Sequence, residues 1–299
     1  MQIREATRAD RARILAFLKA EDPEDYVISW IGRFLAAGRF VLLLDGRKVA
    51  GIVHGRLAPD GSAWLSAARV RPDYRGQGWV NRLNDFALST PGLRSARAAR
   101  MLITHENTSS RRAAAKGGFT QATALSFMEW EQPVSRKAPA GARSGFARVS
   151  PRDFLESARG STLLARQNGF AYMSFNGAFT LDERSARAAR PWLWLSPASG
   201  PVMACMFPDT GERWMAIQAF RSNSTVASGL IDFARARRAE SITVILPAAE
   251  SARRPFARAG YTASEWAKRV LIYDKKVRPN YTRGLTASRG AAARRTRRR

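Results

Sequence analysis

The stretch Val70-Arg71-Pro72-Asp73-Tyr74-Arg75-Gly76-Gln77-Gly78-Trp79-Val80-Asn81 decides the fold that we expect for this chain. An apolar, strand-like segment ends at Val70, the chain turns through Gly76 and Gly78, and a helical pattern begins. Glycine adopts backbone dihedrals that other residues avoid and lets the backbone approach a ligand closely. The first amides of a helix have no partner inside it, and the positive end of the helix dipole lies behind them. The turn therefore predicts a site for an anion such as pyrophosphate.

The first half of the sequence has an ordered series of strand and helix patterns around this turn. Asp45-Gly46 is a hairpin signal between two apolar segments. We expect strands at 2–6, 40–44, 49–57, 63–70, 100–104 and 127–131, and helices at about 10–18, 26–37, 83–87 and 109–116. Such alternation is typical of a mixed α/β domain.

A similar order starts again after residues 134–145, which have no apolar period and are predicted to be a linker. We expect strands at 146–149, 201–207, 213–220, 242–246 and 270–273, helices at 151–164, 226–237 and 252–259, and a turn at 209–211. Lys116-Gly117-Gly118-Phe119 resembles Arg258-Ala259-Gly260-Tyr261, although chance recurrence is an alternative. The sequence predicts two related domains, 1–133 and 146–278, followed by a basic tail at 279–299 without core-forming pattern.

The turn and the order of elements resemble the GNAT N-acetyltransferase superfamily. The signature of that family is Arg or Gln, two residues, Gly, one residue, and then Gly or Ala; Arg75, Gly78 and Val80 stand at these places. The lead-in Pro72-Asp73-Tyr74-Arg75-Gly76 is also typical of the family. A second family motif, an Asn followed by a helix and Gly-Phe, has its match in Asn107 and Phe119. The resemblance covers roughly residues 1–133.

This resemblance implies two tandem GNAT-like domains of the α/β (α+β) class, each a mixed, mostly antiparallel sheet flanked by helices. It implies an acetyl-CoA-dependent N-acetyltransferase that acts on an amine acceptor, which the sequence does not identify. The backbone at residues 70–71 would pair with the pantetheine arm, the amides of 76–81 would hold the pyrophosphate, and Asn107 would lie near the far part of CoA. The expected cofactor-binding residues are Val70, Arg71, Arg75, Gly76, Gln77, Gly78, Trp79, Val80, Asn81 and Asn107.

Two departures from the family pattern affect this expectation. Val80 replaces the usual small residue, and Trp79 is bulkier than the usual aliphatic residue, so both could reshape cofactor binding. The corresponding turn of the second half, residues 220–225, has no glycine, although its Ser, Asn and Thr could cap the helix that follows. We therefore interpret the second half as a degenerate GNAT-like domain and expect one cofactor site per chain.

The proton-transfer groups common in the family are also missing. The strand at 63–70 contains no carboxylate that could act as a base, and Ala114 stands where a tyrosine often acts as an acid. His105 and Glu106, which follow the strand at 100–104, are the remaining catalytic candidates, with a structural histidine and a solvated or capping carboxylate as the alternatives. His54 lies on an apolar strand face and is expected to be buried. Proximity alone could also supply much of the rate.

The net charge of +26 is the strongest feature of the composition. Such a surface attracts phosphate groups, so the alternative function is a catalytically weak or inactive GNAT scaffold that binds RNA or a ribonucleoprotein. The tail at 279–299 would contribute to that contact, although biased composition also explains many arginines. The acidic segment Glu21-Asp22-Pro23-Glu24-Asp25 could attract a cationic amine or be a solvated turn.

Few residue types suited to metals or disulfides are present. Cys205 is the only cysteine, so no internal disulfide forms, and an apolar buried role is expected. The only histidines are His54 and His105, which makes a zinc site improbable. No apolar run is long enough for a membrane span, and the first residues do not resemble an export signal. We expect a cytoplasmic protein without a resident metal or a membrane partner.

Overall fold

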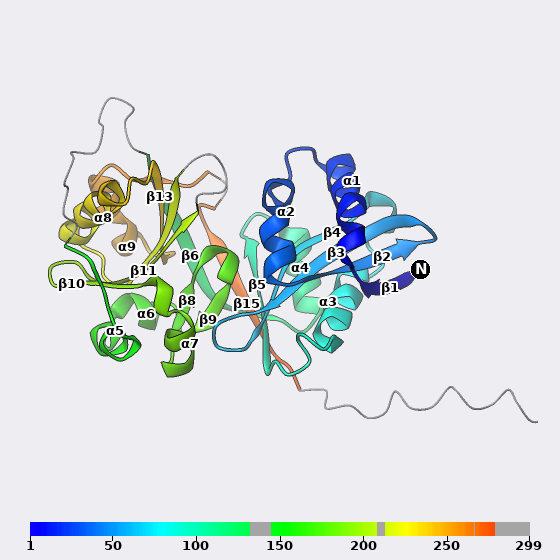
Figure 1. Cartoon of the computed structure of the whole chain (residues 1–299), viewed down its shortest axis with the longest axis horizontal. Coiled ribbons are helices and arrows are strands. Elements are labelled where there is room, and N and C mark those ends of the chain that lie inside the picture. Colours follow the sequence, from blue (N-terminus) through cyan, green and yellow to red (C-terminus); the bar gives the residue numbers. More distant parts are fainter. Residues whose placement is uncertain (132–144, 208–212, 266, 279–299) are drawn as a thin grey trace, which may run out of the picture.

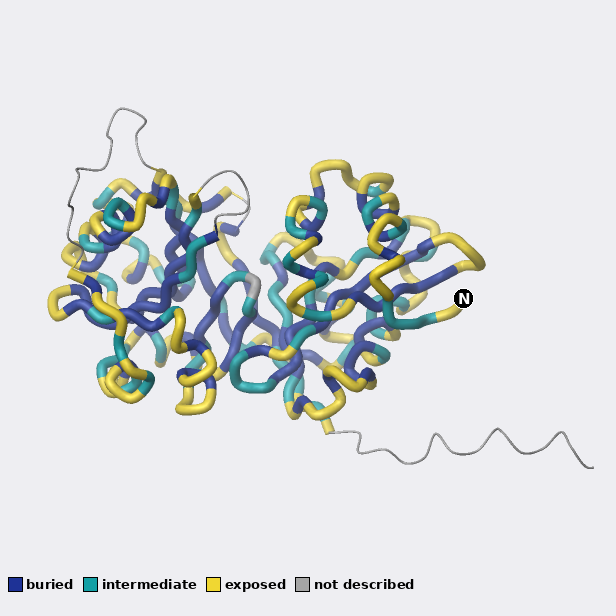
Figure 2. The backbone as a smooth tube through the Cα atoms, in the orientation of Figure 1, coloured by how far each residue is buried: buried dark blue, intermediate teal, exposed yellow. Residues whose placement is uncertain are grey.

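A computed structural model describes residues 1–131, 145–207, 213–265 and 267–278. The predicted tail at 279–299, the turn at 209–211 and almost all of the predicted linker at 134–145 lie outside these residues. One continuous sheet runs through the described part of the chain, and helices cover both of its faces (Figure 1). The buried segments follow the strands, and the outer sides of the helices are exposed (Figure 2).

The strands of this sheet come from both halves of the chain. In order across the sheet they are β1 (Gln2–Glu5), β2 (Arg39–Asp45), β3 (Lys48–Leu57), β4 (Ala63–Val70), β5 (Ala98–Thr104), β15 (Val270–Lys276), β6 (Thr120–Glu131), β13 (Ser241–Pro247), β12 (Trp214–Ala219), β11 (Gly200–Phe207), β10 (Leu193–Ser196) and β7 (Ala147–Arg148). The short β14 (Thr262–Ala263) also pairs with β6, and β8 (Phe170–Tyr172) and β9 (Ala178–Thr180) form a separate pair. Only β4–β5 and β12–β13 are parallel. The predicted mixed, mostly antiparallel α/β class is confirmed.

The helices lie on both faces of the sheet, where they pack against the side chains that alternate along each strand. One face carries α1 (Arg11–Glu21) and α2 (Tyr26–Ala37) in the first half, with α5 (Pro151–Ala158), α7 (Glu183–Ala188) and the β8–β9 pair in the second. The short α6 (Thr162–Arg166) contacts both cores, with Leu163 in the core of the opposite face and Leu164 against the core of this one. The other face carries α3 (Trp79–Ser89), α4 (Thr108–Lys116), α8 (Ser224–Ala236) and α9 (Glu250–Arg258). Short 3-10 turns lie at Arg8–Asp10, Pro72–Tyr74, Ser174–Asn176 and Arg190–Trp192. Successive strand residues point to opposite faces, so each strand contributes to two cores.

The two halves exchange strands at the centre of the sheet. β15, the last strand of the described chain, lies between β5 and β6, pairing Val270 with Thr104 on one side and with Leu125 on the other. The opposite edge of β6 pairs with β13, from Ser241 opposite Glu131 onward. The predicted domains 1–133 and 146–278 therefore each contain a strand that completes the sheet of the other. Cutting the chain at the linker would not separate two closed sheets.

The structure departs from the expected elements in both halves. In the first half, β6 begins at Thr120 and not at residue 127. The helix expected over 151–164 is two helices, because the chain breaks at Gly160 with φ of +82°. Ser161 begins the second helix by accepting a hydrogen bond from the Leu164 amide. The elements α7, β8, β9 and β10 that follow are too short to show a period in the sequence. Within the described residues, no helix has the length and apolar character to cross a membrane.

Candidate functional site

The parallel strands β4 and β5 diverge beside the glycine turn. Their pairing is confined to Ala63 with Ala99 and Trp64 with Arg100, although β4 continues to Val70 and β5 to Thr104. The carboxyl half of β4 therefore has one edge that none of the described strands occupies. An open strand edge presents unpaired amides and carbonyls to a ligand.

A bulge in β4 turns this edge away from β5. Ile52 of β3 faces Arg69 and His54 faces Ser66, so β4 contains one residue more than β3 across this interval. Ala67 within the bulge has φ of +52°, an unusual value for a residue with a side chain. Bulges bend a strand and increase its twist. The bulge thus accounts for the divergence of the two strands.

The backbone of Val70 faces the open side of β4, whereas the amide of Arg71 does not. The Arg71 amide donates to the Ala50 carbonyl of β3 at 2.9 Å. Because backbone groups alternate in an antiparallel ladder, those of Val70 point in the opposite direction. The Val70 carbonyl accepts a hydrogen bond from Nε of Arg75 at 2.9 Å. Of the two residues expected at the pantetheine arm, Val70 is the one whose backbone lies on the open edge.

The glycine turn presents free amides to open space. Gly76 and Gly78 have φ of +78° and +76°, and Gly78 is the N-cap of α3. Within the described part of the chain, no acceptor receives a hydrogen bond from the amides of residues 76–81. A Cβ added at either glycine would meet nothing within 4 Å. The glycines are therefore needed for their conformation, and the volume outside them can hold an anion.

Trp79 and Val80 do not cover these amides. Both side chains are partly buried and pack toward the core under α3. The Trp79 indole donates to Oε1 of Gln77 at 3.1 Å, and Arg82 lies 4.6 Å from the centre of the Trp79 ring. Asn81 points toward Gly117 at the end of α4, where an added Cβ would lie 2.8 Å from Asn81 Oδ1. Trp79 and Val80 thus pack beside the turn and leave its amides uncovered.

Three arginines of β4 and the turn hold the acidic segment 21–25. Glu21 lies 3.3 Å from Nη1 of Arg71 and 3.8 Å from Nη2 of Arg75, and Asp25 is 2.7 Å from Nε of Arg69. Asp25 also accepts a hydrogen bond from the Val27 amide and so caps α2. These two carboxylates are paired within the protein, which leaves Asp22 and Glu24 as the exposed acids of the segment. Neither expectation for the whole segment, an amine-binding cluster or a solvated turn, describes Glu21 and Asp25.

The other predicted site residues lie at the end of β5. Asn107 is exposed and caps α4, accepting a hydrogen bond from the Ser110 amide at 3.0 Å. The His105 amide donates to the Arg269 carbonyl at 3.0 Å, and its Nδ1 is enclosed without a hydrogen-bond partner among the described residues. Glu106 is exposed. The structure therefore brings all three to the mouth of the opening between β4 and β5.

His54 and Cys205 have structural positions. His54 is 1% exposed, with Nε2 2.9 Å from the Phe34 carbonyl and Nδ1 3.2 Å from Oγ of Ser66. These partners place the proton on Nε2, because a carbonyl can only accept. Burial lowers the pKa of His54 to about 4, so the ring is neutral at pH 7. Burial raises the pKa of Cys205 to about 11. His54 has the buried position expected from the sequence, whereas Cys205 is only half-buried.

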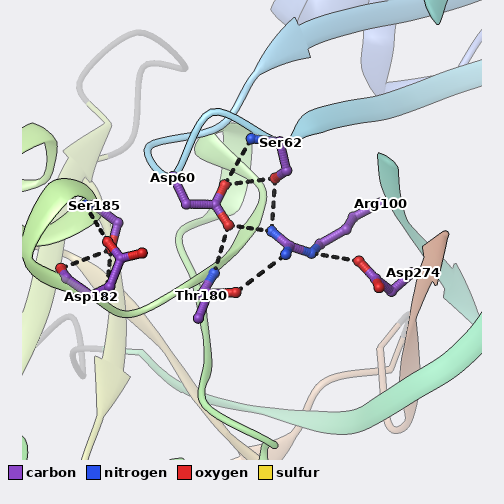
Figure 3. A network of polar contacts seen from close by, with 7 residues as sticks. All are labelled: Asp60, Ser62, Arg100, Thr180, Asp182, Ser185 and Asp274. Carbon is purple, nitrogen blue, oxygen red and sulfur yellow. Dashed lines mark hydrogen bonds and ion pairs between the residues drawn. The ribbon is translucent and has the colours of Figure 1, made fainter. Parts of the chain in front are cut away.

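A buried polar network closes the other end of the opening and joins the two halves (Figure 3). Arg100 of β5, 6% exposed, donates to Asp60 at 2.5 Å, to Asp274 of β15 at 2.8 Å and to Thr180 of β9 at 3.2 Å. Asp60 also accepts from the Thr180 amide at 2.9 Å and from Ser62. The network lies at the level where β4 and β5 still pair, so it fixes the point from which they diverge. Sequence reasoning missed it because its members are far apart in the chain.

A shallow depression beside α4 is separate from the glycine turn. Its lining residues, none of which belongs to the turn, are Thr108, Arg111, Arg112, Ala115 and Tyr273.

Comparison with known proteins gives one family and several similar folds. Residues 5–119 match the sequence model of the Acetyltransferase (GNAT) family. A search of curated proteins found no significant match. Similar solved structures include proposed acetyltransferases from Thermoplasma acidophilum and Pyrococcus horikoshii and a GCN5-related N-acetyltransferase from Sphaerobacter thermophilus.

These three structures align with both halves of the chain. The Thermoplasma protein is 16% identical, with a TM-score of 0.57 over 93% of this chain and 100% of its own. The Pyrococcus protein is 15% identical, with a TM-score of 0.58 over 93% of this chain and 90% of its own. The Sphaerobacter protein is 15% identical, with a TM-score of 0.54 over 93% of this chain and 96% of its own. At these identities the likeness shows the fold, and it does so for nearly the whole length of the chain.

Proposed function

We propose, from the premise that residues 5–119 form a GNAT-family acetyltransferase domain, that this chain transfers an acetyl group from acetyl-CoA to an amine. One observation carries the proposal: the unoccupied edge of β4 leads directly into the free amides of residues 76–81. A long ligand with an amide-containing arm and a pyrophosphate matches both parts of this surface. The arm would pair with the edge at Val70, and the pyrophosphate would lie on the turn.

The second half offers no comparable surface, which supports a single cofactor site per chain. Its parallel strands β12 and β13 pair at five successive positions, from Trp214 with Ser241 to Gln218 with Ile245. The turn after β12 has no glycine, and Asn223 there accepts a hydrogen bond from the Val226 amide at 2.9 Å. Among the second-half residues that the structure describes, we find neither such an open edge at β12 nor a set of free amides in a glycine turn. We therefore assign the second half to completing the sheet and the acceptor side.

Acetyl transfer requires a neutral amine that attacks the thioester carbonyl, and a proton that leaves the amine nitrogen. The carbon–sulfur bond breaks and its electron pair goes to the sulfur of CoA. We propose that His105 or Glu106 receives the amine proton, directly or through water, because both lie at the mouth of the opening. If Glu106 is the base, Glu106→Gln lowers kcat by about 10²-fold or more, whereas acetyl-CoA affinity stays the same.

The experiment that tests the proposal compares two matched glycine variants by calorimetry. Gly78→Asp places a carboxylate on the turn where the pyrophosphate would lie. Gly46→Asp introduces the same side chain at another glycine with positive φ, +53°, and the same open surroundings. We expect Gly78→Asp to lose acetyl-CoA binding and Gly46→Asp to retain it. Absence of binding in the unaltered protein, or binding that survives in Gly78→Asp, would contradict the proposal.

Activity is measured on the same proteins with radiolabelled acetyl-CoA and a panel of amines. The panel contains amino acids, polyamines and aromatic amines, so that transfer reports the acceptor class. Transfer to one class, lost in Gly78→Asp, is the expected result.

A further inference from the structure

Tyr172, in β8 of the second half, lies over the centre of the sheet. Its ring centre is 5.9 Å from that of Trp64 in β4 and 5.6 Å from that of Phe127 in β6. Two strands, β5 and β15, separate β4 from β6 in the sheet. A ring that contacts both Trp64 and Phe127 therefore lies above β5 and β15. In Figure 1, β8 and β9 lie across this central region, and β9 contacts β5.

The apolar cluster that contains Tyr172 extends to the opening between β4 and β5. Pairing of β4 with β5 ends at Arg100, and Leu102 lies two residues farther along β5. Leu102 pairs with Ile272, and both belong to the apolar cluster that contains Tyr172. This cluster also includes Trp30 of α2, so it lies on the face that carries the first two helices. Tyr172 therefore belongs to the same apolar cluster as the part of β5 from which β4 has diverged.

No hydrogen bond joins the Tyr172 hydroxyl to a residue that the structure describes, and this hydroxyl is not among the fully enclosed unpaired atoms. The residue is only 9% exposed. A tyrosine hydroxyl is both a donor and an acceptor, so one that no protein group occupies can donate a hydrogen bond to a ligand. Burial raises the pKa of Tyr172, with a smaller contribution from the nearby Tyr26 of α2. The hydroxyl is thus a neutral donor throughout the pH range in which enzymes work.

The hairpin that carries Tyr172 is firmly held against the first half. The Tyr172 amide donates to the buried Gln218 at 3.2 Å. Gly177, between β8 and β9, lies so close to Trp64 that an added Cβ would be 2.5 Å from its ring. Arg56 of β3 donates to Asn176 at 3.1 Å. A side chain held in this way keeps one orientation, as a group that stabilises a transition state must.

We infer that the second half contributes Tyr172 to the acyl-transfer site of the first half, where its hydroxyl donates a hydrogen bond to the thioester carbonyl oxygen. This inference rests on the proposed function. The carbonyl oxygen gains negative charge when the amine nitrogen attacks the carbonyl carbon, and a preorganised donor stabilises that charge. The tyrosine stays protonated throughout. The amine proton passes to the base or to water, and the sulfur of CoA takes the electron pair of the broken bond.

The test uses the full chain with Tyr172→Phe, which removes the hydroxyl and keeps the ring. Tyr261→Phe is the matched control, because that second-half hydroxyl donates to the Ala227 carbonyl at 3.0 Å, within the core beneath α8 and α9. The first readout is the carbon-13 resonance of acetyl-CoA labelled at the thioester carbonyl and bound to each protein. A hydrogen bond polarises the carbonyl and moves this resonance downfield. The second readout is the rate of CoA release from acetyl-CoA, with water or an amine of the panel as the acceptor.

We expect the bound resonance to move upfield in Tyr172→Phe and to stay unchanged in Tyr261→Phe. CoA release should fall by about 10²-fold in Tyr172→Phe, as when one donor to a developing oxyanion is removed, with an unchanged Kd for acetyl-CoA. If acetyl-CoA binds the unaltered protein and both resonance and rate are the same in Tyr172→Phe, the inference is wrong and the proposed function stands. If acetyl-CoA does not bind the unaltered protein, the proposed function fails and the inference fails with it.

Discussion

Replacing Arg100 by methionine should destabilise the whole molecule, because this side chain joins the centre of the sheet to both halves. Methionine keeps much of the arginine stem and removes the charge that faces Asp60 and Asp274. The Asp60 side chain is 8% exposed and that of Asp274 is 27% exposed. Removal of one partner of a buried ion pair costs about 3–5 kcal/mol. Asp60 keeps its hydrogen bonds from Ser62 and Thr180, so we expect a loss near 3 kcal/mol.

The assay is urea unfolding at pH 7, with Arg152→Met as the control. Arg152 forms an ion pair with Glu156 on the surface, where the two side chains are 87% and 52% exposed. An exposed pair of this kind contributes less than about 1 kcal/mol. The arginine at the centre should therefore stabilise the protein several times more than the one at the surface. Equal losses in the two variants would refute the view that the Arg100 network holds the halves together.

Three further predictions concern pH, the last strand and the tail. The pKa of His54 is about 4 in the folded protein and 6.5 in a model peptide, so the unfolded chain binds more protons between these two pH values. Urea unfolding should therefore show that the free energy of unfolding falls by about 3 kcal/mol as the pH falls from 7 to 4. In the His54→Phe variant, the free energy of unfolding should depend little on pH over this range. Deletion of residues 270–299 removes β15 from beside β5 and should abolish the cooperative unfolding transition and acetyl-CoA binding, whereas deletion of 279–299 should preserve both. Electrophoretic mobility assays should show RNA association that weakens steeply with salt and falls when 279–299 are removed; association unaffected by the deletion would exclude the tail as the contact.

The parts of the fold that depend on local sequence could be predicted. The glycine turn at 76–78 was recognisable because positive φ and free helix amides have a short, local signature. The helix at Tyr26–Ala37 and the strand at Ala63–Val70 have the predicted bounds, since each has a clear apolar period and a clear end. The break at Gly160 was missed because the apolar period continues on both sides of that residue.

The parts that depend on distant contacts could not be predicted. The apolar pattern of β15 indicates a buried strand, but any open edge could accept it, so its insertion between β5 and β6 has no sequence signal. The pairing of Asp25 with Arg69 joins positions 44 residues apart, and that of Arg100 with Asp274 joins positions 174 apart. Tyr172 lies in a three-residue strand, which is too short to show a period. The sequence therefore located the glycine turn and did not determine its surroundings.

Native mass spectrometry of the full chain titrated with acetyl-CoA tests the central claim most directly. We propose that the open edge of β4 and the turn at residues 76–81 form one site, and that the closed pairing of β12 with β13 leaves no second one. We expect a single added acetyl-CoA per chain at saturation, absent in Gly78→Asp and present in Gly46→Asp. Two bound molecules per chain, or one that persists in Gly78→Asp, would contradict it.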